Sequence, residues 1–420
     1  MEELTASLEK LRVAADKDKP KIPEPLDELI NLIHLQDDST EMCQKLVEDG
    51  VLPLVCSALQ SNVPEAQAKA AEFVAEVAKV EVCRQGCVSS GLVPLLVDKM
   101  AATATPVALQ ACRALGNICY EHDGGRVSVM EAGGANQLLT LLQRAAGLPD
   151  TPQDHQLRLV ATGFLLNLLN SYDTVQDQSM DAMLVDILCQ YLDKFAEDED
   201  IPTHVLLSLS CMADTEIGRS LVISRNITGQ LVRVLKVNES AEVTETCLEL
   251  ITNLAETEIV KTQMSQGGIC EAVVDVVKRH RNNPSSELSP PIIKTATDLI
   301  VLILVGDESM GVVYGNGEGP VYKELVDWLT ADVEDLQIAG ALAMGNFARN
   351  VAENCIHDFK GTISEKLFHM PPQHASGGGL KKGILGKRKR IGQRRIYKPA
   401  IAKKRVLRHL LRSGVTRSSF

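Results

Sequence analysis

The stretch RALGNICYEHDGGRVSVMEAGGANQLLTLL (113–142) decides the fold, because both of its halves recur along the chain. The first half is an apolar run that carries one amide, Asn117, and the second is a glycine-marked start of a new apolar run. Similar apolar runs occur elsewhere in the chain, and aligning them places positions 76, 167, 211, 253, 304 and 346 in register with Asn117. The intervals between successive aligned positions, from 76 through 117 to 346, are 41, 50, 44, 42, 51 and 42 residues. A period of this length is typical of helical repeat proteins.

The glycine-marked starts indicate how the helices of one repeat are joined. They occur in EDGVLPLV (48–55), EAGGANQLL (131–139) and SQGGICEAVV (265–274). Glycine allows a sharp turn, and the apolar run after it is the buried face of the next helix. Because each unit can bury that face only against its neighbours, the sequence predicts an all-α fold, an armadillo-repeat right-handed α-solenoid.

The pattern also predicts the order of segments. We expect residues 1–25 to be an N-terminal capping helix (2–15) and a linker (16–25), followed by about eight armadillo repeats in 26–357, the first and last of them partial. Residues 358–370 are a terminal helical remnant, and 371–420 form a basic, disordered tail. The two long intervals indicate insertions at 145–155 and 281–291, which are rich in proline and polar residues.

Charge is divided sharply along the chain. Residues 371–420 hold 15 Lys or Arg and no Asp or Glu, so residues 1–370 hold the other 28 basic residues against all 55 acidic ones. An acidic body of this kind attracts cationic partners and binds nucleic acid poorly. Nucleic acid remains an expected partner only for the tail, at 381–412. The opposed charges also suggest that the tail folds back onto the acidic body.

Other classes of function find little support. The 11 cysteines include no C-x-x-C pair, which favours free buried thiols over metal ligands. Apolar runs such as LIVLILVG (299–306) are too short to insert into a membrane. No spacing of histidines and carboxylates matches a catalytic or metal centre, so we expect no enzyme activity, no cofactor and no metal.

Residues on the third helix of each repeat should line the groove of the solenoid. In importin-alpha-like receptors, a tryptophan lies four residues before the groove asparagine. The equivalent positions here are Glu72, Arg113, Gly163, Leu207, Glu249, Ile300 and Leu342. None of these residues is aromatic, so the groove lacks the aromatic pockets that would hold the aliphatic part of a lysine side chain. The sequence therefore disfavours a receptor for nuclear localisation signals.

Carboxylates occupy the groove register instead. The run AEVTETCLELITNLAE (241–256) places four glutamates and one asparagine at steps of three and four, and therefore on one helical face: Glu242, Glu245, Glu249, Asn253 and Glu256. Glu72 and Glu76 follow the same spacing earlier in the chain. A solvated charged face is the simpler interpretation, but the shared register favours a surface for a polybasic segment.

A second polar set interrupts the alanine-rich run GALAMGNFARN (340–350). Asn346 and Asn350 are four residues apart and share a face, and Arg349 lies beside them. Asn346 could tie two repeats together through a backbone carbonyl, or it could contact a partner in the groove, together with Asn253.

Four motifs carry a resemblance to a known family. RALGNICY, EAGGA, VLILVGDESM (301–310) and LQIAGALAMGNFARN (336–350) closely resemble the small G protein GDP dissociation stimulators. The similarity extends from the N-terminal LEKLRVAADKDK to about residue 354, and the pattern of the family would continue through further repeats where this chain has its tail.

The resemblance implies a regulator and chaperone of small GTPases of the Rho, Rac, Rap and Ras type that end in a polybasic, prenylated tail. By position, Glu245, Glu249 and Glu256, with Glu242, match the acidic patch that receives this tail. Asn346, Asn350, Arg349 and Asn253 match the groove that engages the GTPase. The family implies the cytosol, with the nucleus and the surfaces of the endoplasmic reticulum and mitochondria as further locations. The alternative is a generic armadillo adaptor for basic peptides, in the nucleus because of its tail.

Overall fold

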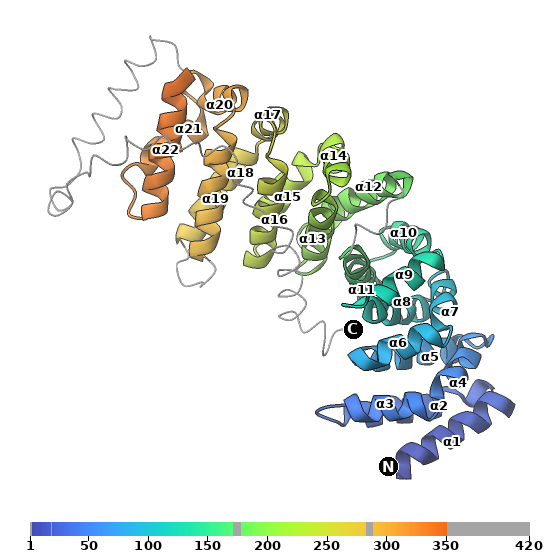
Figure 1. The fold of residues 1–420 in the computed structure, drawn as a ribbon. Helices are drawn as coiled ribbons and strands as arrows, with labels where there is room; N and C mark the ends of the chain where they lie inside the picture. Colours follow the sequence, from blue (N-terminus) through green and yellow to red (C-terminus); the bar gives the residue numbers. More distant parts are fainter. Residues whose placement is uncertain (1, 18, 171–177, 283–288, 351–420) are drawn as a thin grey trace. The chain divides into compact units, whose positions relative to one another are not determined.

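The computed structural model describes the chain except for residues 1, 18, 171–177, 283–288 and 351–420. The described residues form 22 α-helices and no strand (Figure 1). The helices of the first half are α1 (Glu2–Lys17), α2 (Pro23–His34), α3 (Thr40–Glu48), α4 (Val51–Leu59), α5 (Pro64–Ala78), α6 (Glu81–Ser89), α7 (Leu92–Lys99), α8 (Thr105–Cys119), α9 (Asp123–Glu131), α10 (Gly134–Ala145), α11 (Pro152–Leu169) and α12 (Gln178–Lys194).

The second half continues in the same way. Its helices are α13 (Ile201–Ala213), α14 (Glu216–Ser224), α15 (Thr228–Val237), α16 (Ala241–Leu254), α17 (Glu258–Gln266), α18 (Ile269–Asn282), α19 (Ser289–Ile303), α20 (Asp307–Tyr314), α21 (Pro320–Trp328) and α22 (Glu334–Asn350). Among the described residues, 1–195 and 207–221 make up a first compact unit, and 196–206 and 222–350 make up a second.

Most repeats contain a first, a second and a third helix, and the glycine turn separates the first two. Gly50, Gly91 and Gly133 precede α4, α7 and α10, with φ angles of 80°, 79° and 74°. L-residues with a side chain rarely adopt this left-handed conformation, so the glycines are required there. Third helices start with proline near their first turn in α5, α8 and α11, where its missing N–H is tolerated.

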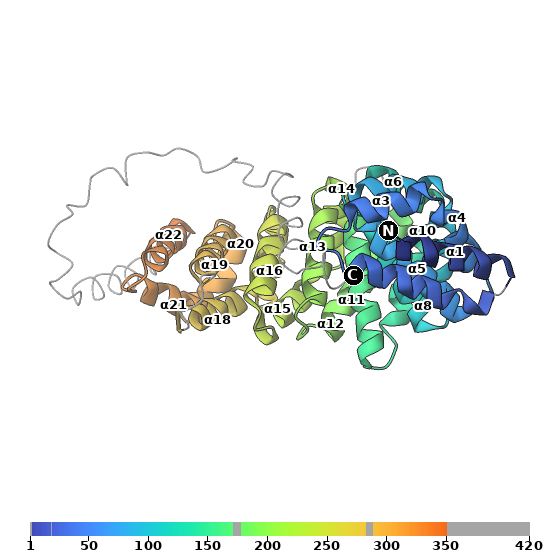
Figure 2. The same ribbon diagram turned by 90° about the horizontal axis from the view of Figure 1, so that it is seen from below.

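The third helices stack on one another within each unit. In the first unit α8 packs between α5 and α11, and in the second unit α19 packs between α16 and α22. Figures 1 and 2 show the second row from two directions, running from yellow-green α16 through α19 to orange α22. This stacking confirms the predicted fold class, an all-α solenoid of armadillo-like repeats.

Two of the register asparagines hold the third helices together. Asn117 on α8 donates from Nδ2 to the Ala75 carbonyl oxygen on α5 at 2.9 Å, and Asn167 on α11 donates to the Gly116 oxygen on α8 at 3.1 Å. Both asparagines are buried. Asparagines at these two positions of the register therefore tie neighbouring repeats together through a backbone carbonyl.

Basic side chains link the second helices in a similar manner. Arg144 on α10 donates to the carbonyl oxygens of Met100 and Ala101, just past the end of α7. In the second unit Arg279 on α18 donates to the oxygens of Leu235 and Asn238 at the end of α15. These carbonyls have no partner within their own helix, so a cation from the next repeat stabilises the helix end.

Several predictions about segments need revision or lie outside the described residues. The N-terminal helix is present as α1, and the connection that follows it is shorter than the expected linker at 16–25. α1 runs to Lys17, and α2 already begins at Pro23, because proline is well tolerated at a helix start. The predicted insertion at 145–155 is held by buried Arg158, which donates to the oxygens of Ala145 and Leu148. The remnant at 358–370 and the tail at 371–420 lie outside the described residues.

The cysteines that the structure describes are all free, and most are buried. Burial raises the pKa of Cys43 and Cys87 to about 12, so these thiols stay protonated and unreactive. In the same part of the chain, no helix has the length and apolar character to cross a bilayer.

Candidate functional site

The predicted acidic patch lies mainly on α16 in the second unit. Ser240 caps the start of α16, and its side chain accepts a hydrogen bond from the Val243 N–H. Glu242, Glu245 and Glu249 then follow at steps of three and four on one face, and all three are partly exposed. We call these three residues the α16 acidic face. The partly exposed side of α16 is therefore acidic.

Two residues predicted for the same stripe differ from this picture. Glu256 is exposed, but α16 ends at Leu254 and its cap is Ala255, so Glu256 lies beyond the helix and does not extend its face. Asn253 is on α16 but is only 7% exposed, and no hydrogen-bond partner of its Nδ2 is found among the described residues. A buried amide cannot serve as a groove contact without movement of the helices around it.

The second predicted set lies on α22. Asn346 is half-buried there, whereas Arg349 and Asn350 are on the helix but their side chains lie outside the described residues. No hydrogen bond of the Asn346 side chain occurs within the described chain. In the repeat register, the Ile303 carbonyl corresponds to the carbonyls that accept hydrogen bonds from Asn117 and Asn167. The Ile303 oxygen accepts a hydrogen bond from the Ser309 hydroxyl at 2.6 Å. In the described chain, Asn346 thus lacks the hydrogen bond to the preceding third helix that Asn117 and Asn167 make.

The structure does not bring these two sets into contact. α19 lies between α16 and α22 (Figures 1 and 2). On α19, Lys294 and Asp298 pair at 2.7 Å and are exposed. The two predicted polar sets of the second unit therefore lie on α16 and α22, with α19 between them.

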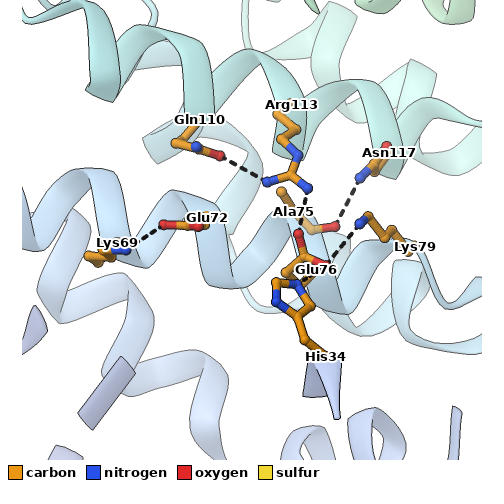
Figure 3. Close-up of polar contacts among 9 residues, drawn as sticks. All are labelled: His34, Lys69, Glu72, Ala75, Glu76, Lys79, Gln110, Arg113 and Asn117. Carbon is orange, nitrogen blue, oxygen red and sulfur yellow. Dashed lines mark hydrogen bonds and ion pairs between the residues drawn. The ribbon is translucent and has the colours of Figure 1, made fainter. Parts of the chain in front are cut away.

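A different arrangement surrounds the earlier carboxylates, Glu72 and Glu76, in the first unit. Figure 3 shows Glu76 of α5 surrounded by three basic side chains, which come from α2, from the end of α5 and from α8. Its Oε1 lies 2.5 Å from Arg113 Nη2 on α8, and its Oε2 lies 2.9 Å from Lys79 Nζ and 3.0 Å from His34 Nε2 on α2. The Glu76 residue is only 3% exposed. We call these four residues the Glu76 cluster.

The charge state of Glu76 follows from these contacts. Burial acts to raise the pKa of its carboxyl, but the Arg113 charge and the hydrogen bonds from Lys79 and His34 outweigh burial, so the pKa is lowered. Glu72, one turn earlier, pairs with Lys69 at 2.9 Å. The expectation that Glu72 and Glu76 form a polybasic-binding stripe is therefore wrong for Glu76, because intramolecular cations already occupy that carboxylate.

The structure also shows what occupies the positions where importin-alpha-like receptors carry tryptophan. Arg113 occupies one slot position and turns toward Glu76, and Ile300 occupies another but is fully buried. Leu342 on α22 is 50% exposed. The single tryptophan, Trp328, is buried in α21, away from the groove register. These positions offer no ring face for a lysine stem.

The sequence analysis missed His34 and Lys79. Lys79 is three residues after Glu76, a spacing that helix geometry favours for an ion pair, and this signal was available. His34 precedes the first aligned repeat, so no register relates it to Glu76. Groups of three or more His, Cys, Asp or Glu side chains able to hold a metal ion do not occur among the described residues.

Comparisons with known proteins agree with the motif resemblance. No family model matches the chain. The Rap1 GTPase-GDP dissociation stimulators 1-A and 1-B of Xenopus laevis are 33% and 32% identical over 381 residues, which cover 90% of this chain and 62% of each relative. The GTPase-GDP dissociation stimulator vimar of Drosophila melanogaster is 31% identical over 325 residues, 75% of this chain and 50% of that protein.

The chain thus spans less than two thirds of the length of these relatives. Among solved structures, the crystal structure of an engineered protein matches with a TM-score of 0.61 and 20% identity, over 86% of this chain and 81% of its own. At that identity the match supports the fold alone. The relatives carry the stronger conclusion: over most of its length, this chain is similar to the GTPase-GDP dissociation stimulators.

Proposed function

We propose that this protein binds small GTPases and stimulates their release of GDP. The names of its relatives support this activity, and Rap is the GTPase that two of those names contain. The single observation of the structure that carries the proposal is the α16 acidic face, with Glu242, Glu245 and Glu249 partly exposed on one side of a third helix. In this proposal the face receives a basic segment of the client.

The charge of the surrounding unit supports this role. Residues 222–350 contain 18 Asp or Glu and 10 Lys or Arg, so the field around α16 is negative. A negative surface attracts a polybasic segment over a distance of about 10 Å at 0.1 M salt, and the attraction weakens as salt increases. Glu76 in the first unit forms no comparable face, because this carboxylate is buried and contacts Arg113, Lys79 and His34.

Stimulated release of GDP requires no chemical step by this protein. A protein that binds the open, nucleotide-free conformation of the GTPase more tightly than the closed one shifts the equilibrium toward release. Binding energy from the basic tail can hold the client in place while Asn346, Arg349 and Asn350 on α22 contact its folded domain. This division of roles accounts for two separate polar sets on the second unit.

The finer parts of the proposal concern the clients. We propose that they include Rho, Rac and Ras types besides Rap, that they end in a polybasic and prenylatable tail, and that the protein also acts as their chaperone. Exposed acidic groups favour basic tails of any of these GTPases equally well, so the α16 acidic face selects for charge and not for one client.

The experiment follows GDP release from the client. A Rap-type GTPase loaded with fluorescent GDP is mixed with the full-length chain, and a second client carries glutamine in place of the lysines and arginines of its tail. We expect faster release from the first client and a loss of most of this effect with the second. Equal release from both clients would refute the role of the acidic face. Binding of the isolated tail without stimulated release would instead indicate an adaptor for basic peptides.

A further inference from the structure

The chain contains three residues with a side-chain hydroxyl that are followed directly by proline, at Thr105, Thr151 and Ser289. Each lies at the start of a third helix, in α8, α11 and α19 respectively. Their exposure differs, because Thr151 is exposed, Thr105 is half-buried and Ser289 is only 2% exposed. The three residues therefore place one kind of dipeptide in three different environments.

Thr151 also differs from the other two in backbone conformation. It is the N-cap of α11 and lies outside the helix, with φ −91° and ψ 154°, the extended conformation that a following proline favours. Thr105 and Ser289 are already the first residues of their helices. Residues 149–153 are all exposed, so Thr151 lies within an accessible stretch. An enzyme that binds its substrate in an extended conformation can therefore reach Thr151 with less rearrangement than Thr105 or Ser289.

Arg158 holds the residues that precede Thr151. Its guanidinium donates to the carbonyl oxygens of Leu148 at 2.6 Å and Pro149 at 2.8 Å, and it pairs with Asp150 Oδ1 at 3.2 Å. Arg158 itself is only 1% exposed. A buried cation of the first unit thus fixes the connection before α11 in the conformation that presents Thr151.

The Thr151 hydroxyl both accepts and donates a hydrogen bond. Its Oγ1 accepts the Asp154 N–H at 3.1 Å, which caps α11, and donates to Asp154 Oδ2 at 2.7 Å. The other oxygen of this carboxylate, Oδ1, accepts the Thr105 hydroxyl at 3.5 Å. Asp154 thereby joins the first turns of α8 and α11. Its contact with Thr151 requires the hydroxyl proton, because an ionised carboxylate can only accept.

We propose that Thr151 is a phosphorylation site for a proline-directed serine/threonine kinase. In this reaction Thr151 Oγ1 bonds to the γ-phosphorus of ATP, the bond to the leaving ADP oxygen breaks, and the hydroxyl proton passes to the kinase. The phosphate carries a charge of about −1.5 to −2 at pH 7, and Asp154 loses the proton that it accepted. The phosphate oxygens still accept the N–H groups of α11 but repel the Asp154 carboxylate, which weakens its link to α8.

The test is incubation of the full-length chain with a mitogen-activated protein kinase, ATP and Mg²⁺, followed by mapping of the phosphate by mass spectrometry. We expect Thr151 to be modified at least about tenfold faster than Thr105 or Ser289, because these two require local opening of a helix start. The variant Thr151→Ser should keep the reaction, whereas Pro152→Ala should lose most of it with unchanged helix content by circular dichroism. Equal rates at Thr151 and Thr105, no phosphate on Thr151, or full reaction of Pro152→Ala would overturn the proposal.

A second measurement tests the displacement of Asp154. Urea midpoints are compared with and without the phosphate, in the wild type and in Asp154→Asn, which removes the charge and keeps the size of the side chain. We expect phosphorylation to shift the midpoint less favourably in the wild type than in Asp154→Asn, because only the wild type has a carboxylate beside the phosphate. The control Asp98→Asn, an exposed carboxylate on α7, should respond to phosphorylation as the wild type does. Equal shifts in all three proteins would contradict repulsion between the phosphate and Asp154.

Discussion

Glu76 on α5 and Glu249 on α16 come from acidic stripes with the same helical spacing, yet their environments differ. Glu76 is 3% exposed and contacts Arg113, Lys79 and His34, whereas Glu249 is partly exposed on a face that it shares with Glu242 and Glu245. Helical spacing therefore predicts which side of a helix carries a carboxylate. It does not predict how deeply the carboxylate is buried or which side chains of neighbouring repeats surround it, because both depend on tertiary packing.

The largest effect should follow removal of the Glu76 carboxylate. Glu76→Ala leaves Arg113 and Lys79 without their shared partner in a buried position, and we expect the free energy of unfolding to fall by about 3 kcal/mol. Urea denaturation monitored by circular dichroism measures this loss. The matched control is Glu72→Ala, a partly exposed carboxylate of the same helix, which should cost less than about 1 kcal/mol. Equal losses in the two variants would mean that the Glu76 cluster has no special role.

A smaller effect should distinguish the two kinds of register asparagine. Asn117→Ala removes a buried hydrogen bond to the Ala75 carbonyl oxygen, and we expect a loss of about 1–2 kcal/mol. Asn346→Ala removes no hydrogen bond found in the described chain and should change stability by less than about 0.5 kcal/mol. The same urea experiment compares them. A large loss for Asn346→Ala would show that this residue also ties repeats together.

Acid should weaken the Glu76 cluster selectively. The pKa of Glu76 is lowered in the folded protein, so its contribution to stability is present above the unfolded value of 4.5 and is lost as the pH falls through the lower folded value. We therefore expect the stability difference between wild type and Glu76→Gln to shrink below about pH 4.5. Urea midpoints between pH 7 and pH 3 test this, and a difference that is constant with pH would contradict the charge state assigned to Glu76.

The smallest effect concerns the basic tail. Deleting 371–420 should raise the affinity for a basic client by a few-fold at low salt and much less at high salt, if the tail competes for the α16 acidic face. Titration of a fluorescent client into both forms of the protein gives the two affinities. Identical affinities at low salt would show that the tail does not compete.

Much of the fold could be predicted because the repeat places similar residues at similar intervals. The register of Asn117 identifies the third helices, and Gly50, Gly91 and Gly133 identify the turns, since both depend on short-range geometry. The linker at 16–25 was predicted too long, because prolines indicate a break but also favour a helix start. Glu256 was placed on α16 because the spacing continues past Ala255, where the helix has ended.

The site was harder to predict than the fold. The Glu76 cluster joins residues from three repeats, and no spacing along the chain shows that His34 approaches Glu76. Asn253 and Asn346 share one register but differ in burial, because the helices that cover them differ. Contacts of this kind depend on tertiary packing, which the period of the repeat does not contain.

The most direct measurement is the affinity of a basic-tailed GTPase for two variants with equal charge. Glu245→Lys with Glu249→Lys reverses the α16 acidic face, and Glu239→Lys with Asp275→Lys makes the same change at exposed positions of the second unit that are not on α16. At low salt, the account predicts at least about a tenfold loss of affinity for the first variant and a much smaller loss for the second. Equal losses in the two variants would show that only net charge matters and would contradict a specific role for the α16 acidic face.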